Sequence, residues 1–217
     1  MRPVLAVTGL RAEAAIAAQA GFIPVCAGGV PERTEALLAR FLEDGASAIV
    51  SFGIAGGLSP ALRPGTLLLP GHVLSESGRH EASSPWRQSL LDAGIGIGAS
   101  LYGAEKPAVS AVEKAALHAA TGAVAVDLES HIVARAAAEA GLPFLVVRAI
   151  ADPAECDLPE AALIPLRPDG TPDLPRIIAA TLRQPRQIPA LIRLGGHTSR
   201  ALAALRGSLG PLGMAMG

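Results

Sequence analysis

Aromatic residues, cysteines and long apolar runs are all scarce in this chain of 217 residues. Aromatic side chains make up only 3% of it, which argues against the stacking surfaces that bind single-stranded nucleic acid. We therefore expect no nucleic-acid partner. The two cysteines, Cys26 and Cys156, match neither a disulfide framework nor a pair of metal ligands, so both are predicted to be free thiols. No apolar run reaches the roughly 18 residues that a membrane-spanning helix needs.

Several signatures of cofactor binding and targeting are also missing. The five histidines show no metal-ligand spacing, and we expect neither a metal nor an organic cofactor. The glycine-rich residues 51–58 lack the lysine of a nucleotide-triphosphate loop and the spacing of the dinucleotide fingerprint. Residues 1–7 do not have the basic start, apolar run and cleavage site of a secretion signal, which predicts a cytoplasmic protein.

Charge is divided unevenly along the chain, although the net charge is only −1. Of the 18 lysines and arginines, six lie beyond Asp173, where no acidic residue follows, and residues 1–173 hold the other 12 against 19 acidic residues. We interpret residues 174–217 as a basic helical extension that packs on the domain or meets a membrane. Arginines beside an apolar face are typical of a surface for anionic lipid. The residues predicted for that face are Ile188, Leu191, Ile192, Leu194, Leu202 and Leu205.

Apolar runs of strand length alternate with alanine-rich helical patterns along most of the chain. The predicted strands are 4–7, 22–26, 48–52, 66–69, 73–74, 99–102, 123–126 and 144–150. The predicted helices are 12–20, 32–44, 85–93, 111–120, 130–140, 174–182, 188–194 and 198–205, and Gly21 and Gly141 are expected to end two of them. This alternation favours an α/β fold with a largely parallel sheet. Residues 153–175, rich in proline and acid, are predicted to leave the sheet as a loop.

Two acidic residues stand where predicted strands give way to a helix or a loop. Glu129 follows the strand at 123–126, and Asp152 follows the strand at 144–150. Open α/β sheets bind ligands at the carboxyl ends of their strands, so both side chains could reach one cleft. A carboxylate that grips a hydroxyl group and a carboxylic acid that donates a proton would suit catalysis there.

The candidate acids also have ordinary structural interpretations. Glu13 lies in the first turn of a predicted helix, where the helix dipole favours an acid. Glu129 could likewise be a first-turn acid, with Asp127 as the N-cap. Asp152 precedes a proline and could be a turn residue. Arg148, inside a predicted strand, favours a structural ion pair, with a phosphate-binding role left open.

Four short segments together resemble the nucleoside phosphorylase and nucleosidase superfamily, in particular the methylthioadenosine/S-adenosylhomocysteine nucleosidases. They are residues 9–13 (GLRAE), 53–58 (GIAGGL), 126–130 (VDLES) and 147–152 (VRAIAD). Within the superfamily the chain most resembles the hopanoid-associated phosphorylases, whose assigned reaction removes adenine from adenosylhopane, and this likeness extends into residues 184–191. The resemblance implies a three-layer α/β fold, with a central mixed and largely parallel sheet flanked by helices and a C-terminal helical tail.

The resemblance also implies roles for individual residues. Glu13 matches the carboxylate that activates the attacking water, Glu129 the one that binds the ribose 2′-hydroxyl, and Asp152 the acid that protonates the purine at N7. Such an acid helps because adenine leaves poorly as an anion, and burial would raise the pKa of Asp152 in the useful direction. Ala151 replaces a serine common beside this acid, which predicts a less firmly oriented Asp152. The substrate-binding positions that match the family are Leu128, Ile54, Ala55, Gly56 and Ala151.

The acceptor of the ribosyl group is predicted from a departure from the family's phosphorylases. Those enzymes hold phosphate with an arginine and a serine near the glycine loop, where this chain has Ile54 and Ser51. An isoleucine cannot pair with an anion. Water is therefore favoured over phosphate, unless Arg11, Arg33 or Arg79 supplies the positive charge.

We therefore predict a catalytic domain over residues 1–173 that cleaves the N-glycosidic bond of an adenine nucleoside, with adenosylhopane in hopanoid biosynthesis as the preferred substrate and phosphate as an alternative co-substrate. The alternatives are a methylthioadenosine/S-adenosylhomocysteine nucleosidase, a purine nucleoside phosphorylase of salvage, and a nucleoside- or lipid-binding protein without turnover. We expect a homodimer, because the superfamily usually dimerises. It would be cytoplasmic, with peripheral contact to the inner membrane through its basic tail.

Overall fold

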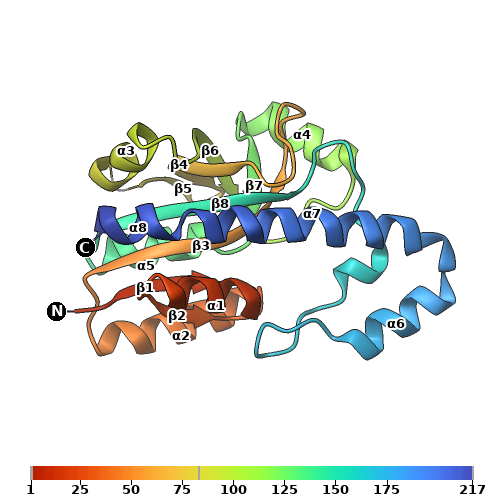
Figure 1. Cartoon of the computed structure of the whole chain (residues 1–217), viewed down its shortest axis with the longest axis horizontal. Helices are drawn as coiled ribbons and strands as arrows, with labels where there is room; N and C mark the ends of the chain where they lie inside the picture. The colour runs from red at the N-terminus through yellow and green to blue at the C-terminus, as the bar shows by residue number, and fades with distance from the viewer. Residues whose placement is uncertain (1, 83, 217) are drawn as a thin grey trace.

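The computed structural model describes residues 2–82 and 84–216, which form an eight-stranded sheet covered by helices (Figure 1). The strands are β1 (Val4–Thr8), β2 (Ile23–Cys26), β3 (Ala48–Gly57), β4 (Leu67–Ser75), β5 (Gly78–Glu81), β6 (Ile97–Gly103), β7 (Ala125–Asp127) and β8 (Phe144–Asp152). The helices are α1 (Arg11–Gln19), α2 (Pro31–Glu43), α3 (Ser84–Asp92), α4 (Ala111–Thr121), α5 (Ser130–Glu139), α6 (Leu174–Arg183), α7 (Ile188–Gly207) and α8 (Leu209–Met216). Two short 3₁₀ helices, η1 (Glu160–Leu163) and η2 (Pro185–Gln187), flank α6.

The sheet is mixed and largely parallel, as predicted. Its strand order is β2-β1-β3-β7-β6-β4-β5, and β8 pairs with both β3 and β4. The parallel pairs are β1 with β2, β1 with β3, β3 with β8, β4 with β6, and β6 with β7. Antiparallel pairs join β3 to β7, β4 to β5 and β4 to β8. Because β1 and β8 both run parallel to β3, their carboxyl ends meet at one edge of the sheet.

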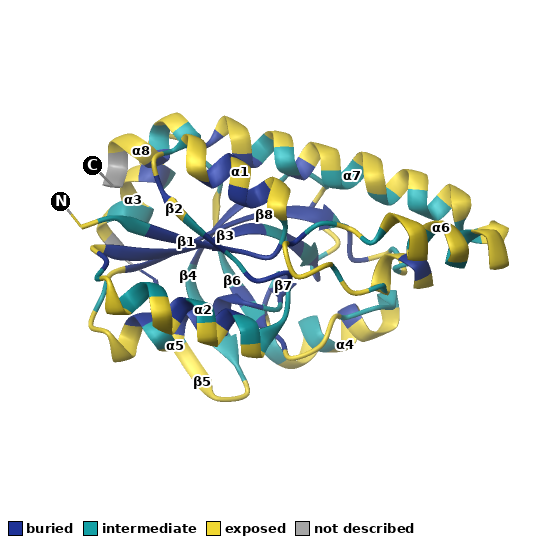
Figure 2. Cartoon of the chain, turned by 90° about the horizontal axis from the view of Figure 1, so that it is seen from below, coloured by how far each residue is buried: buried dark blue, intermediate teal, exposed yellow. Residues whose placement is uncertain are grey.

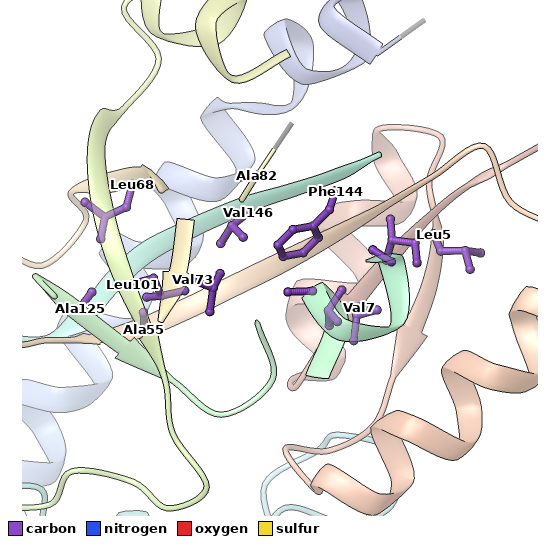
Figure 3. Close-up of a cluster of buried hydrophobic side chains, with 14 of the residues drawn as sticks. Leu5, Val7, Ala55, Leu68, Val73, Ala82, Leu101, Ala125, Phe144 and Val146 are labelled. Atoms are coloured by element: carbon purple, nitrogen blue, oxygen red, sulfur yellow. The ribbon is translucent and has the colours of Figure 1, made fainter. Parts of the chain in front are cut away.

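Helices cover both faces of the sheet (Figure 2), and each face carries its own apolar layer. Helices α2 and α5 cover one face, and their Leu38 and Val133 belong to the same buried cluster as Leu5 and Phe144 of the strands. Figure 3 shows Leu5, Phe144 and other members of this cluster. Helices α1, α7 and α8 cover the other face. Their contributions to that second layer are Ile16, Ala17, Ala201, Leu205 and Leu212. The three-layer arrangement predicted from the resemblance is therefore confirmed.

Local sequence signals explain several helix boundaries. Gly21 and Gly141 follow α1 and α5 with φ values of 81° and 65°, which a glycine adopts without strain. Ser110 caps α4 by accepting a hydrogen bond from the amide of Glu113, whose carboxylate in turn accepts from the Ser110 amide. The expected helix ends at Gly21 and Gly141 are thus confirmed.

The structure differs from the predicted elements in four places. The two short strands predicted at 66–69 and 73–74 are one strand, β4, and the polar edge strand β5 was not predicted. The helices predicted at 188–194 and 198–205 are one continuous helix, α7, which runs through Gly195 and Gly196. Helix α8 was not predicted either. Packing of α7 against β8 and β3 explains why two adjacent glycines do not interrupt it (Figure 1).

The basic C-terminal segment has two distinct parts. Helices α7 and α8 lie along the sheet and bury Ala201, Leu205 and Leu212 in its second apolar layer. Helix α6 lies at one end of the molecule, beside η1, and has no buried residue (Figure 1). Leu202 and Leu205, which we predicted for a lipid-facing surface, instead pack against the body of the protein. Ile188 and Ile192 of that predicted face are exposed.

Candidate active site

A cavity of about 310 Å³ lies at the carboxyl ends of β1, β7 and β8. Its charged lining consists of Glu13, Asp127, Glu129, Arg148 and Asp152. These residues come from segments far apart in the sequence. The edge of the sheet at which we expected a cleft therefore holds one, and the three predicted carboxyl groups share it.

Glu13 lies in the first turn of α1, and three backbone amides hold its carboxylate. Oε2 accepts hydrogen bonds from the amides of Gly9 at 3.1 Å and Leu10 at 2.8 Å, and Oε1 accepts one from Ile54 at 2.8 Å. Burial raises the pKa of Glu13, although Arg148 and these amides oppose the shift. A carboxylate that is fixed in direction and more basic than in water is suited to take a proton from a nucleophile.

Arg148 is the cation of the cavity lining, and a cluster of polar side chains surrounds it. Its Nη2 lies 2.5 Å from Asp127 Oδ2 and 3.4 Å from Glu129 Oε2, and it donates to Ser51 Oγ at 2.7 Å. Ser130 Oγ lies 2.8 Å from Ser51 Oγ and donates to Asp127 Oδ2 at 2.5 Å. The structural ion pair predicted for Arg148 is confirmed. Ser51 is fully buried within this cluster and does not line the cavity.

At the start of α5, the sequence left open which of Asp127 and Glu129 caps the helix and which takes part in the site. Asp127 Oδ1 accepts a hydrogen bond from the amide of Ser130 at 3.2 Å, so Asp127 provides the side-chain cap. Glu129 makes no capping hydrogen bond and points its carboxylate toward Arg148 and the cavity. Burial, assisted by the nearby charges of Asp127 and Glu13, raises the pKa of Glu129 to about 7 against the pull of Arg148.

Asp152 is the last residue of β8, and it forms an ion pair with Lys114, a residue that we did not single out from the sequence. Its Oδ2 lies 2.5 Å from Nζ of Lys114, which comes from α4 and is fully buried. Burial raises the pKa of Asp152, and Lys114 acts in the opposite direction. Lys114 gave no signal in the sequence, because a single lysine in an alanine-rich helix normally faces solvent.

The remaining predicted site residues fall into two groups. Leu128, Ile54, Ala55 and Gly56, for which the resemblance implied substrate binding, line the cavity. Ala151 does not line it, because its side chain points into the second apolar layer on the other side of the strand.

The arginines considered for phosphate lie outside the cavity lining. Arg11 pairs with Asp169 at 3.2 Å on the surface, and Arg33 donates to the carbonyls of Ala27 and Pro168. Arg79 pairs with Glu81 on β5. The structure thus brings together the carboxyl groups but leaves these three cations elsewhere.

The other walls of the cavity are apolar. They are formed by Pro107, Ala108, Val126, Leu128, Leu158, Ala162, Ile164 and Leu166. Several of these residues belong to η1 and its neighbours, inside the stretch 153–175 that was predicted to be a loop. That stretch does leave the sheet, but it returns to close the site, which a composition rich in proline and acid did not reveal.

Within residues 2–82 and 84–216, no group of three or more His, Cys, Asp or Glu side chains is placed to hold a metal ion. In the same part of the chain, no helix is both long and apolar enough to span a membrane. Cys26 and Cys156 are free thiols, as predicted.

Known proteins share part of this sequence and the fold of the chain. The sequence model of the Phosphorylase superfamily matches residues 96–166, a stretch that includes Glu129, Arg148 and Asp152. No curated protein matches the chain. Among solved structures, the 5′-methylthioadenosine/S-adenosylhomocysteine nucleosidase of Neisseria meningitidis, in complex with methylthio-immucillin-A, aligns over 100% of both chains with a TM-score of 0.73 and 13% identity. The chain has the fold of these nucleosidases.

Two further solved structures share that fold. The S-adenosylhomocysteine nucleosidase of Streptococcus pyogenes, in complex with 5-methylthiotubericidin, aligns over 99% of this chain and 97% of its own with a TM-score of 0.71 and 14% identity. Native futalosine hydrolase of Helicobacter pylori aligns over 97% of both chains, also with a TM-score of 0.71 and 14% identity. The fold class predicted from the resemblance is confirmed.

Proposed function

We propose that this protein is a nucleosidase that hydrolyses the N-glycosidic bond of an adenine nucleoside. The observation that carries the proposal is the convergence of Glu13, Glu129 and Asp152 on one cavity, with burial raising the pKa of all three. Two nucleosidases of the same fold have been solved with bound nucleoside analogues. The residues matched by the superfamily model include two of the three acids, Glu129 and Asp152. No cofactor enters the proposed reaction.

The three acids divide the chemistry of one displacement at the anomeric carbon. Water attacks C1′ and gives a proton to Glu13, while the C1′–N9 electron pair moves into the purine and N7 takes the proton of Asp152. Glu129 binds the ribose hydroxyls and stabilises the positive charge that develops on the ribose. The products are adenine and the free ribosyl compound, and exchange of one proton with solvent at each acid restores the starting state.

Water is the proposed acceptor rather than phosphate. Among the described residues that line the cavity, Arg148 is the one with a positive charge, and its Nη2 is paired with the carboxylates of Asp127 and Glu129. A phosphate ion would therefore enter a site whose fixed charge is negative overall. Water avoids that repulsion.

The proposed physiological substrate carries a lipid at the ribose 5′ position, as adenosylhopane does. The apolar wall formed by Leu158, Ala162, Ile164 and Leu166 supports this choice, because it offers no partner for a polar substituent. A second candidate is methylthioadenosine, which is favoured by the size of the cavity. The cavity volume of about 310 Å³ is near the lower end of the roughly 300–1,000 Å³ typical of small-molecule sites. A lipid would therefore have to extend out of the cavity.

Helix α6 is the proposed contact with the membrane that holds such a lipid. Leu174, Ile178 and Leu182 follow one another at four-residue spacing and are 61%, 57% and 74% exposed. Arg176 and Arg183 lie on the opposite side of this helix by the same periodicity. Helix α6 contacts η1, which lines the apolar wall of the cavity, so the exposed face lies close to the site.

Vesicle sedimentation tests the membrane contact with α6 left in place, because α7 and α8 form part of the core. Wild-type protein should bind vesicles of phosphatidylglycerol more tightly than vesicles of phosphatidylcholine, and binding should weaken with salt. The double variant Ile178→Glu/Leu182→Glu should lose binding, whereas Val112→Glu, at an equally exposed position of α4, should retain it. Equal binding by both variants would overturn the proposal, and a change of oligomeric state in the double variant would assign the face to a second copy.

We also propose a homodimer at the cytoplasmic side of the inner membrane, on the strength of the resemblance. Light scattering during size-exclusion chromatography measures its mass directly. A mass of 21.9 kDa, that of the single chain, would contradict the dimer.

The decisive activity experiment measures adenine release from adenosylhopane and methylthioadenosine in parallel, with and without phosphate. A free ribosyl product would support hydrolysis, and a phosphorylated sugar would restore the phosphorylase alternative. Glu13→Gln and Asp152→Asn should each lower kcat by about 10²–10⁴-fold. Glu32→Gln, which removes an exposed first-turn acid from α2, is the matched control and should retain activity. Nucleoside binding without adenine release by the wild type would instead identify a binding protein.

A further inference from the structure

The ammonium group of Lys114 is buried, and its hydrogen bonds all go to Asp152 and the residues that follow it. Besides Asp152 Oδ2 at 2.5 Å, it donates to the carbonyl oxygens of Pro153 at 3.1 Å and Cys156 at 2.8 Å. An ammonium has three protons, so all of its donors have partners. The side chain is 0% exposed. Lys114 therefore ties the carboxyl end of β8 and the turn that follows it to helix α4.

A buried lysine needs a reason, because removing its charge from water is costly unless hydrogen bonds and an opposite charge compensate. Lys114 does not line the cavity, and its contacts are with Asp152 and the following turn. Oδ2 of Asp152 is the oxygen it holds. Among the described residues, Oδ1 accepts no side-chain hydrogen bond, and Asp152 lines the cavity. The two oxygens of this carboxyl group thus have different surroundings.

On the basis of the proposed function, we propose that Lys114 is a positioning residue for the Asp152 acid: it holds Oδ2 and leaves Oδ1 to carry the proton that protonates the leaving purine. A carboxylic acid that faces an ammonium with one oxygen keeps its proton on the other oxygen. As the proton passes to N7, Asp152 becomes negative beside a fixed positive charge. The interaction is therefore stronger in the transition state than before it, which is the condition for catalysis.

The contact with Lys114 gives Asp152 an orienting partner although position 151 has no hydroxyl group. We expected a loosely oriented Asp152 because Ala151 has no hydroxyl group. The structure contradicts that expectation, since Lys114 supplies the orienting donor from a different element. Gly56 assists by leaving room, because a Cβ there would lie 3.2 Å from Asp152 Oδ2.

Other charged groups near Asp152 bear on its titration. A small cavity behind it, of about 30 Å³, is lined also by Cys156, Asp157, Arg193 and His197. His197 acts with Lys114 to favour the ionised form of Asp152. Across the main cavity stand Glu13, Asp127, Glu129 and Arg148. Lys114 is the group among these that forms an ion pair with Asp152.

The test removes the charge of Lys114 while keeping part of its hydrogen-bonding capacity. Lys114→Gln retains two donors without a charge, Lys114→Met removes both, and Lys106→Gln changes an exposed lysine as a control. With methylthioadenosine, Lys114→Gln should lower kcat by about tenfold to a hundredfold with little change in KM. The alkaline limb of its kcat profile should move to higher pH, because loss of the ammonium favours the protonated form of Asp152. An unchanged kcat, or a lower kcat with an unmoved alkaline limb, would overturn the proposal.

A double-variant cycle separates positioning from a purely structural role. If Lys114 acts through Asp152, Lys114→Gln should slow the Asp152→Asn variant no further, whereas independent effects would multiply. NMR titration of the Asp152 carboxyl carbon in wild type and Lys114→Gln gives a readout that does not depend on turnover. The pKa of Asp152 should be higher in the variant. If the pKa of Asp152 is higher in Lys114→Gln but the wild type releases no adenine, only the proposed function is wrong. If the pKa of Asp152 is equal in the two proteins, the proposed role of Lys114 is wrong.

Discussion

Glu13 and Arg148 approach the same backbone position from two elements, so that a methyl group at Gly53 would lie 2.7 Å from Glu13 Oε1 and 2.5 Å from Arg148 Nη1. The base and the cation of the proposed site therefore share the space on one side of β3 that a side chain at Gly53 would fill. Glycine is required there for space, since the φ of Gly53 is not positive.

Gly53→Ala should consequently displace both charged groups. We expect a loss of about 1–3 kcal/mol in the free energy of unfolding, as for other overpacked buried sites, and a large loss of kcat. Gly195→Ala is the matched control, because a Cβ there meets nothing within 4 Å and the glycine lies inside helix α7. It should raise stability by about 0.5–1 kcal/mol and leave kcat unchanged. Urea denaturation and adenine release measure the two effects, and equal stability changes in both variants would contradict the close contact.

Replacement of Arg148 tests whether the buried cation holds the acidic cluster together. Arg148→Met should cost about 3–5 kcal/mol, because Asp127 and Glu129 would be left in the interior without their partner. Arg135→Met removes an exposed pair with Glu35 and should cost about 0–1 kcal/mol. Adding Asp127→Asn to Arg148→Met should recover part of the loss. A similar cost for Arg148 and Arg135, measured by chemical denaturation, would rule out this account.

The titration of Glu129 predicts how stability depends on pH. Its pKa is raised from 4.5 to about 7 in the folded protein. Between these values the folded state binds more protons than the unfolded chain, so the free energy of unfolding should fall as the pH rises from about 4.5 to 7 and level off above.

Glu129→Gln should remove this contribution, which is on the order of 3 kcal/mol, so the variant should lose less stability than the wild type between pH 5 and pH 8. Glu43→Gln, at an exposed position, should leave the dependence intact. Denaturation of the three proteins at both pH values checks the prediction. A wild type that gains stability across this range, with Glu129→Gln unchanged, would show the opposite sign.

The placement of Arg11 and Arg33 predicts that neither arginine takes part in turnover. Arg11→Ala and Arg33→Ala should have the wild-type kcat and KM for methylthioadenosine, both without phosphate and with a saturating amount of it. Small effects on stability are expected, because Arg11 forms an exposed ion pair and Arg33 donates to loop carbonyls. A phosphate-stimulated rate that either variant abolishes would reinstate phosphorolysis.

Sequence reasoning located most strands, most helices and the three acids because these depend on local pattern. Asp152 terminates an apolar run, and Glu129 stands between the short strand β7 and helix α5. The roles of these acids came from the resemblance, since a first-turn acid such as Glu13 has an ordinary structural explanation as well. The tail was harder to interpret. Its arginines were recognised, but the pattern did not distinguish α7, which packs on the sheet, from the exposed α6.

What the sequence determined by itself is the order of the elements and the chemical character of their ends, because apolar periodicity, glycine and capping residues act within a few neighbours. Tertiary structure alone decided that Lys114 meets Asp152, that Ala151 points into the core, and that Arg11 and Arg33 stay outside the cavity. Each of these outcomes depends on contacts between segments distant in the chain. For the charged residues, burial costs free energy and pairing with an opposite charge offsets that cost, and which residues are buried and paired is decided only when helices and strands pack.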